Sequence, residues 1–210
     1  TTSGFLSHSQ QQRLFDVLTE EGYAVIAPQA RDGCIVYAET RDAADLPWGI
    51  SLSQEAGSSK IRKGDHHFCF AWANGPQALK PLLFAPREPL WRISRKQDGF
   101  AVEGIETDAR PLAVIGVRAC DLAALSIQAQ HFVGGPCPDP HYAARREGLL
   151  LIAVNCTHPA ATCFCASTGD GPEASRGFDL SLTEIEGGFV VKAGSKAGER
   201  ILASLPLADA

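Results

Sequence analysis

Methionine does not occur anywhere in the 210-residue sequence, position 1 included. We therefore expect a processed chain or a part of a longer protein, and composition does not decide between the two. Residues 1–4 lack the basic start and the apolar stretch of an export signal. Because the seven cysteines are odd in number, reduced or metal-bound thiols in a cytoplasmic protein are favoured over a disulfide framework.

Long apolar runs and clusters of basic residues are also missing. No stretch approaches the roughly 20 apolar residues that a membrane-spanning helix needs, so no membrane span is expected. The 19 basic and 24 acidic residues give a net charge of −5, which argues against nucleic acid as a partner. Neither of the glycine-rich patterns that bind nucleotides, G-x-G-x-x-G and G-x-x-x-x-G-K-[ST], occurs, so nucleotide binding has no support.

Local patterns predict a mixed N-terminal region. Residues 6–23 have apolar side chains at helical spacing, with Ser7 or Ser9 placed to cap a helix and Gly22 placed to end it. The other elements expected here are strands over residues 23–27 and 34–37, a loop over 41–64, a strand over 66–72, an irregular segment over 79–95 and a hairpin of 91–94 with 100–103.

The second half of the sequence predicts a parallel unit. Residues 111–117 and 149–154 are apolar throughout, which is typical of buried parallel strands, and helices are expected between them over 121–132 and 139–147. Strands over 178–184 and 188–192 and a helix over 196–205 follow. The predicted class is therefore α/β, with the mixed N-terminal region packed on a parallel strand–helix–strand unit that displays a cysteine loop.

The cysteine loop follows the second of these parallel strands. Cys156, Cys163 and Cys165 lie within ten residues there, which is one thiol short of a closed tetrahedral site. Cys120 follows the end of the other parallel strand. Because the carboxyl ends of neighbouring parallel strands form one crevice, we expect the fourth thiol to come from Cys120.

Four thiolates suit either zinc or an iron–sulfur cluster. The spacing lacks the paired C-x₂-C knuckles of common zinc sites, which favours iron–sulfur, although it is not a ferredoxin run either. The alternative interpretation is that free cysteines are buried small hydrophobic residues. We favour that interpretation for Cys34 and Cys69, and we expect Cys137 to be an exposed loop thiol.

Other polar residues near the loop have ordinary structural interpretations. Asp121 is most simply a cap at the start of a helix, and His158 is a candidate to replace one thiol. Arg145 and Arg146 suit either a solvated helix face or a partner's carboxylate or phosphate. Only one of His66 and the residue after it can face inward from a strand.

Four segments of the chain resemble one family of redox subunits. They are GVRACDLAAL at 116–125, DPHYAARREGLLLIAVNC at 139–156, TCFCASTGDGP at 162–172 and NGPQALKPLLFAPREPLW at 74–91. In these segments, which extend over most of the chain, it is similar to the beta subunit of sulfhydrogenase-type nickel-iron hydrogenases and to the A subunit of anaerobic sulfite reductase.

The resemblance implies an electron-transfer subunit of an anaerobic oxidoreductase complex, with no turnover of its own. It implies that a [4Fe–4S] cluster is held by Cys120, Cys156, Cys163 and Cys165. The partners would be other redox subunits of hydrogenase or sulfite reductase type, with a flavin subunit among the candidates. The competing hypothesis is a structural or docking module with zinc, or nothing, at the thiols.

Two departures from the family pattern bear on these expectations. Family members usually continue into a C-terminal ferredoxin-like domain with further cysteine runs, and no such runs occur in this sequence. We therefore expect residues 1–210 to form a single α/β domain, either the N-terminal part of a longer protein or a shortened member. Thr168 stands where methionine is common in the family, and we do not expect it to alter ligation.

Overall fold

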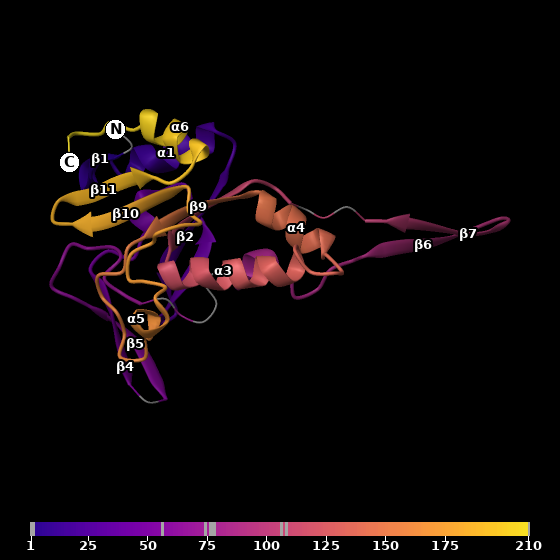
Figure 1. Ribbon diagram of the computed structural model, residues 1–210, viewed down its shortest axis with the longest axis horizontal. Coiled ribbons are helices and arrows are strands. Elements are labelled where there is room, and N and C mark those ends of the chain that lie inside the picture. Colours follow the sequence, from indigo (N-terminus) through magenta and orange to yellow (C-terminus); the bar gives the residue numbers. More distant parts are fainter. Residues whose placement is uncertain are drawn as a thin grey trace.

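The computed structural model describes residues 3–55, 57–73, 75, 79–105, 107 and 109–209. Within these residues, seven strands lie side by side in one sheet (Figure 1). In spatial order they are β1 (Ser3–Ser7), β11 (Gly188–Ala193), β10 (Leu180–Ile185), β9 (Leu149–Val154), β8 (Leu112–Val117), β2 (Ala24–Arg31) and β3 (Cys34–Glu39).

The middle of the sheet is parallel and its edges are antiparallel. β2, β8, β9 and β10 run parallel, whereas β3, β11 and β1 pair antiparallel with their neighbours. Successive side chains of β9 enter two different cores, as Leu151 and Ile152 do on opposite faces. Because both faces of the strand are covered, its sequence is continuously apolar. The predicted α/β class and the parallel strand–helix–strand unit are confirmed.

Helices cover both faces of the sheet. α1 and α6 pack on one face, and α2, α3 and α4 pack on the other (Figure 1). The helices are α1 (Gln12–Glu20), α2 (Lys80–Leu83), α3 (Ala119–Phe132), α4 (Pro140–Glu147), α5 (Cys165–Thr168) and α6 (Lys196–Ala203), with the 3₁₀ turns η1 (His8–Gln10) and η2 (Ala43–Asp45). Two hairpins lie outside the large sheet: β4 (Ile50–Glu55) with β5 (Ser58–Lys63), and β6 (Trp91–Lys96) with β7 (Gly99–Gly104).

The first predicted helix is wrong at its start. Instead of helix from residue 6, the chain forms β1, in which Phe5 pairs with Val190 of β11, and α1 begins only at Gln12. The backbone of Phe5 also exchanges hydrogen bonds with Ala208, so long-range pairing overrides the local helical pattern. Neither serine caps α1, whereas Gly22 follows its end with a φ of +88°, a conformation that favours glycine.

Three further predictions in the N-terminal half are wrong. The expected loop over residues 41–64 contains the hairpin β4–β5, the irregular segment expected over 79–95 contains the short helix α2, and the expected strand over 66–72 is not a strand. The latter segment is buried as its apolar content suggests, with Phe70 and Trp72 each about 1% exposed. Its backbone bonds to charged side chains instead of to a neighbouring strand. Of the segment 74–91, residues 74 and 76–78 lie outside the described residues.

Two buried charged side chains satisfy this backbone. Glu184 on β10 accepts hydrogen bonds from the amides of Cys69 and Phe70, at 2.6 and 2.8 Å. Arg118, between β8 and α3, donates at 2.9 Å to the carbonyls of Phe70 and Trp72. The guanidinium carbon of Arg118 also lies 5.0 Å from the Trp72 ring centroid, a cation–π contact. The irregular segment is therefore held from both sides by charge-assisted hydrogen bonds.

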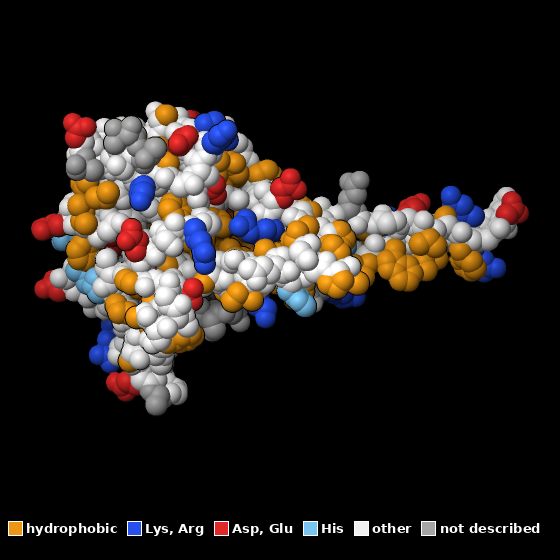
Figure 2. Space-filling model, viewed as in Figure 1, with side chains coloured by type: hydrophobic (Ala, Val, Ile, Leu, Met, Phe, Trp, Pro, Cys, Tyr) orange, Lys and Arg blue, Asp and Glu red, His pale blue; other side chains and the backbone are white. Residues whose placement is uncertain are grey.

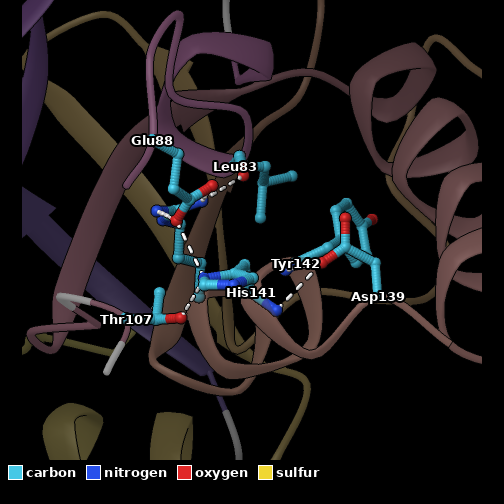
Figure 3. Close-up of polar contacts among 7 residues, drawn as sticks. Leu83, Glu88, Thr107, Asp139, His141 and Tyr142 are labelled. Carbon is cyan, nitrogen blue, oxygen red and sulfur yellow. Dashed lines mark hydrogen bonds and ion pairs between the residues drawn. The ribbon is translucent and has the colours of Figure 1, made fainter. Parts of the chain in front are cut away.

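The hairpin β6–β7 projects far from the body of the molecule, as Figures 1 and 2 show. It matches the hairpin that the sequence predicts over residues 91–103. The two legs of the hairpin are fixed at its base by a cluster of four side chains, drawn in Figure 3. We call this cluster the hairpin clamp: Glu88 before β6, Thr107 after β7, and His141 and Arg145 on α4.

Within the hairpin clamp, Arg145 forms an ion pair with Glu88 and also donates to the carbonyl of Leu83 at 3.2 Å. His141 Nδ1 lies 3.0 Å from Glu88 Oε1 and within hydrogen-bond distance of the Thr107 hydroxyl. The hydrogen bond from Arg145, with a smaller contribution from His141, lowers the pKa of Glu88. One carboxylate therefore links both legs of the hairpin to α4.

We predict that Arg118→Ala destabilises the protein strongly. The substitution leaves the carbonyls of Phe70 and Trp72 buried without donors, and orphaned groups of this kind cost about 1–3 kcal/mol each. Urea unfolding should therefore give a loss of roughly 3 kcal/mol in the free energy of unfolding. The control is Arg62→Ala on the exposed surface of β5, and equal losses for the two variants would contradict the role given to Arg118.

We predict that the clamp is sensitive to acid. A carboxyl group whose pKa is lowered on folding stabilises the protein above its unfolded pKa, and this stabilisation is lost as the pH falls through the lowered value. The difference in free energy of unfolding between the protein and Glu88→Gln should therefore be full at neutral pH, begin to fall near the unfolded pKa of about 4.3, and vanish once the pH is below the lowered pKa of Glu88. A difference that persists unchanged in acid would contradict this, and Glu186→Gln in the exposed turn after β10 is the control.

Candidate functional site

The two parallel strands β8 and β9 bring Cys120 and Cys156 to the same end of the sheet. The strands are neighbours, with Leu112 opposite Leu149 and Val117 opposite Ala153. Cys120 lies in the first turn of α3, directly after β8, and Cys156 lies two residues beyond β9. Both residues therefore lie at the carboxyl ends of neighbouring parallel strands, the end of a sheet at which ligands commonly bind.

The turn at Gly171 and Pro172 is the point around which these residues meet. The amide of Cys156 donates to the carbonyl of Pro172 at 3.1 Å. A Cβ atom at Gly171 would lie 3.2 Å from Cys165 Sγ and 3.4 Å from Ala119 Cβ, next to Cys120. Glycine at position 171 thus allows the cysteine loop to close tightly over the start of α3. Figure 1 accordingly shows α5, which begins at Cys165, close to α3.

Cys163 occupies the outer part of the loop. It is exposed, and its Sγ accepts a hydrogen bond from the amide of Ala160 at 3.3 Å. The backbone between Cys163 and Cys165 is not extended, because Phe164 has a ψ of 12° and Cys165 already begins α5. Phe164 itself is 71% exposed, so an apolar ring stands at the surface between the two thiols.

The thiol of Cys120 lies where its ionised form is disfavoured. Partial burial raises the pKa of Cys120 to about 11, with further contributions from Asp121 and from Cys165. The thiolate of Cys120 is therefore unfavourable without a cation, and a metal centre would supply the compensating charge. Within the described residues, no three His, Cys, Asp or Glu side chains lie close enough together to hold a single metal ion.

The other three cysteines either lie away from this end of the sheet or make no polar contact with the candidate ligands. Cys69 is buried, as predicted, and burial raises its pKa well above the ordinary value. Cys137 is exposed, also as predicted. The prediction for Cys34 is wrong, because it begins the edge strand β3 and is exposed, on the wall of a largely apolar cavity of about 490 Å³.

The other polar residues singled out in the sequence have structural partners. Asp121 accepts a hydrogen bond from the amide of Arg118 at 2.9 Å, which is the predicted role at the helix start. His158 contacts the Thr157 hydroxyl at 2.9 Å, and its ring lies 6.5 Å from that of His66. Arg145, for which a solvated face or an external anion was expected, forms an ion pair within the chain.

Sequence reasoning did not identify Arg118 and Glu184 as the residues that position the site. Besides its bonds to the 66–72 segment, Arg118 reaches the carbonyls of Val154 and Asn155, at 3.5 and 3.4 Å. It thus connects the start of α3, with Cys120, to the end of β9, before Cys156. A local signal did exist for Glu184, since it continues the alternation of Leu180 and Leu182 on the inward face of its strand.

None of the helices formed by the described residues combines the length and the apolar content needed to cross a membrane.

Comparison with known proteins gives one distant relative. A stretch of 123 residues, 59% of this chain, is 29% identical to the sulfhydrogenase 2 subunit beta of Pyrococcus furiosus. The chain covers 34% of that protein's length. No family model and no solved structure matches the chain. At this distance the comparison supports a relation to hydrogenase beta subunits, and it gives no support for a relation to sulfite reductase subunits.

Proposed function

We propose that this chain is an electron-transfer domain of a hydrogenase-type oxidoreductase complex in the cytoplasm. In this proposal a [4Fe–4S] cluster is bound by Cys120, Cys156, Cys163 and Cys165. The observation that carries it is the meeting of two adjacent strand ends and the cysteine loop at the turn of Gly171 and Pro172. The name of the distant relative, a hydrogenase subunit, supports the same class of complex.

The sequence spacing of the cysteines favours a cluster over zinc, because it lacks the paired C-x₂-C knuckles of common structural zinc sites. A [4Fe–4S] cluster takes each thiolate on a different iron atom, and so it accepts a wider ring of sulfurs than the tetrahedron around one zinc ion.

The chain's own residues would set the properties of the site. Arg118 fixes the relative positions of the strand ends that carry Cys120 and Cys156. The amide of Ala160 donates to Cys163 Sγ at 3.3 Å, and hydrogen bonds to ligand sulfurs raise the reduction potential of such centres. A bound [4Fe–4S] cluster supplies one-electron transfer at low potential.

Electrons would then pass between protein neighbours. The sequence has no nucleotide-binding pattern, so a soluble donor such as NADH has no evident site. The loop that carries Cys163 is at the surface, and exposed Phe164 stands beside it. We propose that this loop faces another redox subunit of the complex, a flavin subunit or a further cluster-binding subunit, and that Phe164 contributes to the contact.

We predict that iron binding depends on the four proposed ligands. Cys120→Ser, Cys156→Ser, Cys163→Ser and Cys165→Ser should each lose most of the iron and acid-labile sulfide of protein purified without oxygen, because a serine hydroxyl is rarely ionised and binds iron poorly. Cys34→Ser and Cys137→Ser, which alter exposed thiols elsewhere, are the matched controls and should retain both. Full iron retention in two of the first four variants would refute the four-thiolate site. Stoichiometric zinc without sulfide would replace it by a structural metal site.

We also predict that the isolated, cluster-loaded chain has no turnover of its own. Hydrogen uptake, sulfite reduction and NAD(P)H-dependent dye reduction should all remain at background, because in this proposal the chain only passes electrons between protein partners. In contrast, dithionite should bleach the visible absorption of the loaded protein. Robust turnover in any of the three assays would show that the chain is an enzyme rather than a relay.

A further inference from the structure

The projecting hairpin β6–β7 has one apolar face. In its register Trp91 lies opposite Gly104, Ile93 opposite Val102 and Arg95 opposite Phe100. Directly opposed residues point to the same side of a two-stranded sheet, so these apolar side chains share one face. Their exposed fractions are 61% for Trp91, 56% for Ile93, 74% for Phe100 and 65% for Val102. We call this surface the hairpin face.

Exposure of this kind is unusual for a chain that functions alone. An isolated hairpin of two strands is only marginally stable in water, and contiguous exposed apolar surface marks interaction sites. Figure 2 shows apolar side chains gathered along the hairpin, well away from the body of the molecule. Leu90, which precedes β6 at the base of the hairpin, is also exposed, at 55%. Covering this surface would therefore be favourable for the protein.

The hairpin is also held in a fixed position. The hairpin clamp ties the residues before and after it to α4, and the amide of Ile105 extends the pairing to the carbonyl of Leu90 at 3.2 Å. A surface on a fixed base loses less conformational entropy on binding than one on a free loop. This arrangement suits a preformed docking element.

The charges on the hairpin face indicate whether its binding partner is a second copy of this chain or a different protein. Arg95 lies on the hairpin face near its tip, and among the described strand residues no carboxylate shares that face, because Glu103 lies opposite Arg92 on the other side. Two copies packed through their hairpin faces would therefore place the Arg95 cations in the interface without carboxylates to pair with them. The hairpin face is complementary instead to an apolar groove bordered by carboxylates.

α3 lies between the hairpin and the thiols, and its exposed side is uncharged. The exposed positions of α3 carry no Lys, Arg, Asp or Glu, and Cys120, Ala124, Ile127 and His131 follow one another at helical spacing along it. Ile127 is 68% exposed. α3 and the apolar side of the hairpin are both visible in the common view of Figures 1 and 2. A partner lying along α3 would reach from the hairpin to Cys120.

We propose that the hairpin face is the docking site of a different protein subunit, one that offers an apolar groove with carboxylates where Arg95 lands. The inference rests on the proposed function in one respect, which is that this subunit belongs to the same redox complex. Docking on the hairpin and along α3 places the partner beside the thiol site, and the hairpin supplies affinity without using the cysteine loop.

The test uses the tagged full chain expressed in its own host, with a photo-crosslinking amino acid at Ile93 or Val102. The matched positions Ser94 and Ala101 form the opposite face of the same hairpin. We expect crosslinks from 93 and 102 to one other subunit of the purified complex, at a segment with apolar residues flanked by Asp or Glu, and at least about tenfold fewer from 94 and 101. Crosslinks to a second copy of this chain, equal yields from both faces, or no crosslinks would overturn the proposal.

Variants of the hairpin face provide a second measurement. Ile93→Ser combined with Val102→Ser, and separately Arg95→Glu, should lower the amount of co-purified subunit about tenfold or more, while Ala101→Ser should not. The melting temperature of the chain should stay unchanged, because these side chains are exposed and lie outside the core. Retention of the subunit by both variants would contradict the docking site.

Iron and sulfide measured in the same preparations separate this inference from the proposed function. Loss of the subunit with iron retained supports the docking site and leaves the cluster in place. A chain without iron that still crosslinks through 93 and 102 would refute the cluster alone, and the docking site would stand.

Discussion

The buried side chains of Arg118 and Glu184 impose the constraint on which the rest of the structure depends. The segment around Phe70 and Trp72 crosses the core without belonging to a strand, so its amides and carbonyls need partners other than a neighbouring backbone. Glu184 accepts from the amides and Arg118 donates to the carbonyls. Burying each charge is costly, and these hydrogen bonds offset the cost because each is made to a fixed backbone group. Arg118 also donates, through Nη1, to the carbonyls of Val154 and Asn155 at the end of β9. The interaction that completes the core thus also aligns the two strand ends at the thiol site.

The sequence predicts the elements that depend on local patterns, and it misses those that depend on contacts between distant parts of the chain. Continuous apolar runs correctly indicate β8 and β9, because a parallel strand covered on both faces needs nothing more specific. The start of the chain is mispredicted because β1 depends on pairing with β11, nearly the whole chain away. Likewise the segment 66–72 has the composition of a strand, and only Arg118 and Glu184, distant in sequence, make it irregular. That the strand ends carrying Cys120 and Cys156 are neighbours was predictable from topology alone. The helical turn of the backbone that begins at Cys165 was not.

Two separate surfaces result from this architecture. The thiol site lies at the carboxyl ends of the parallel strands, where backbone amides and a closely packed glycine turn surround the sulfurs. The hairpin β6–β7 lies at the far end of the molecule, fixed to α4 by Glu88 and its partners (Figure 3). α3 runs between them with an uncharged outer side. If the hairpin supplies the binding energy for a partner subunit, the cysteine loop can stay accessible for electron transfer.

The most direct test of the central claim is a crystal structure of the chain purified and reconstituted with iron and sulfide in the absence of oxygen. We predict one [4Fe–4S] cluster at the ends of β8 and β9, bound by Cys120, Cys156, Cys163 and Cys165, with Arg118 still bonded to the carbonyls of Phe70 and Trp72. A cluster on other cysteines, or a single zinc ion at the same thiols, would contradict it.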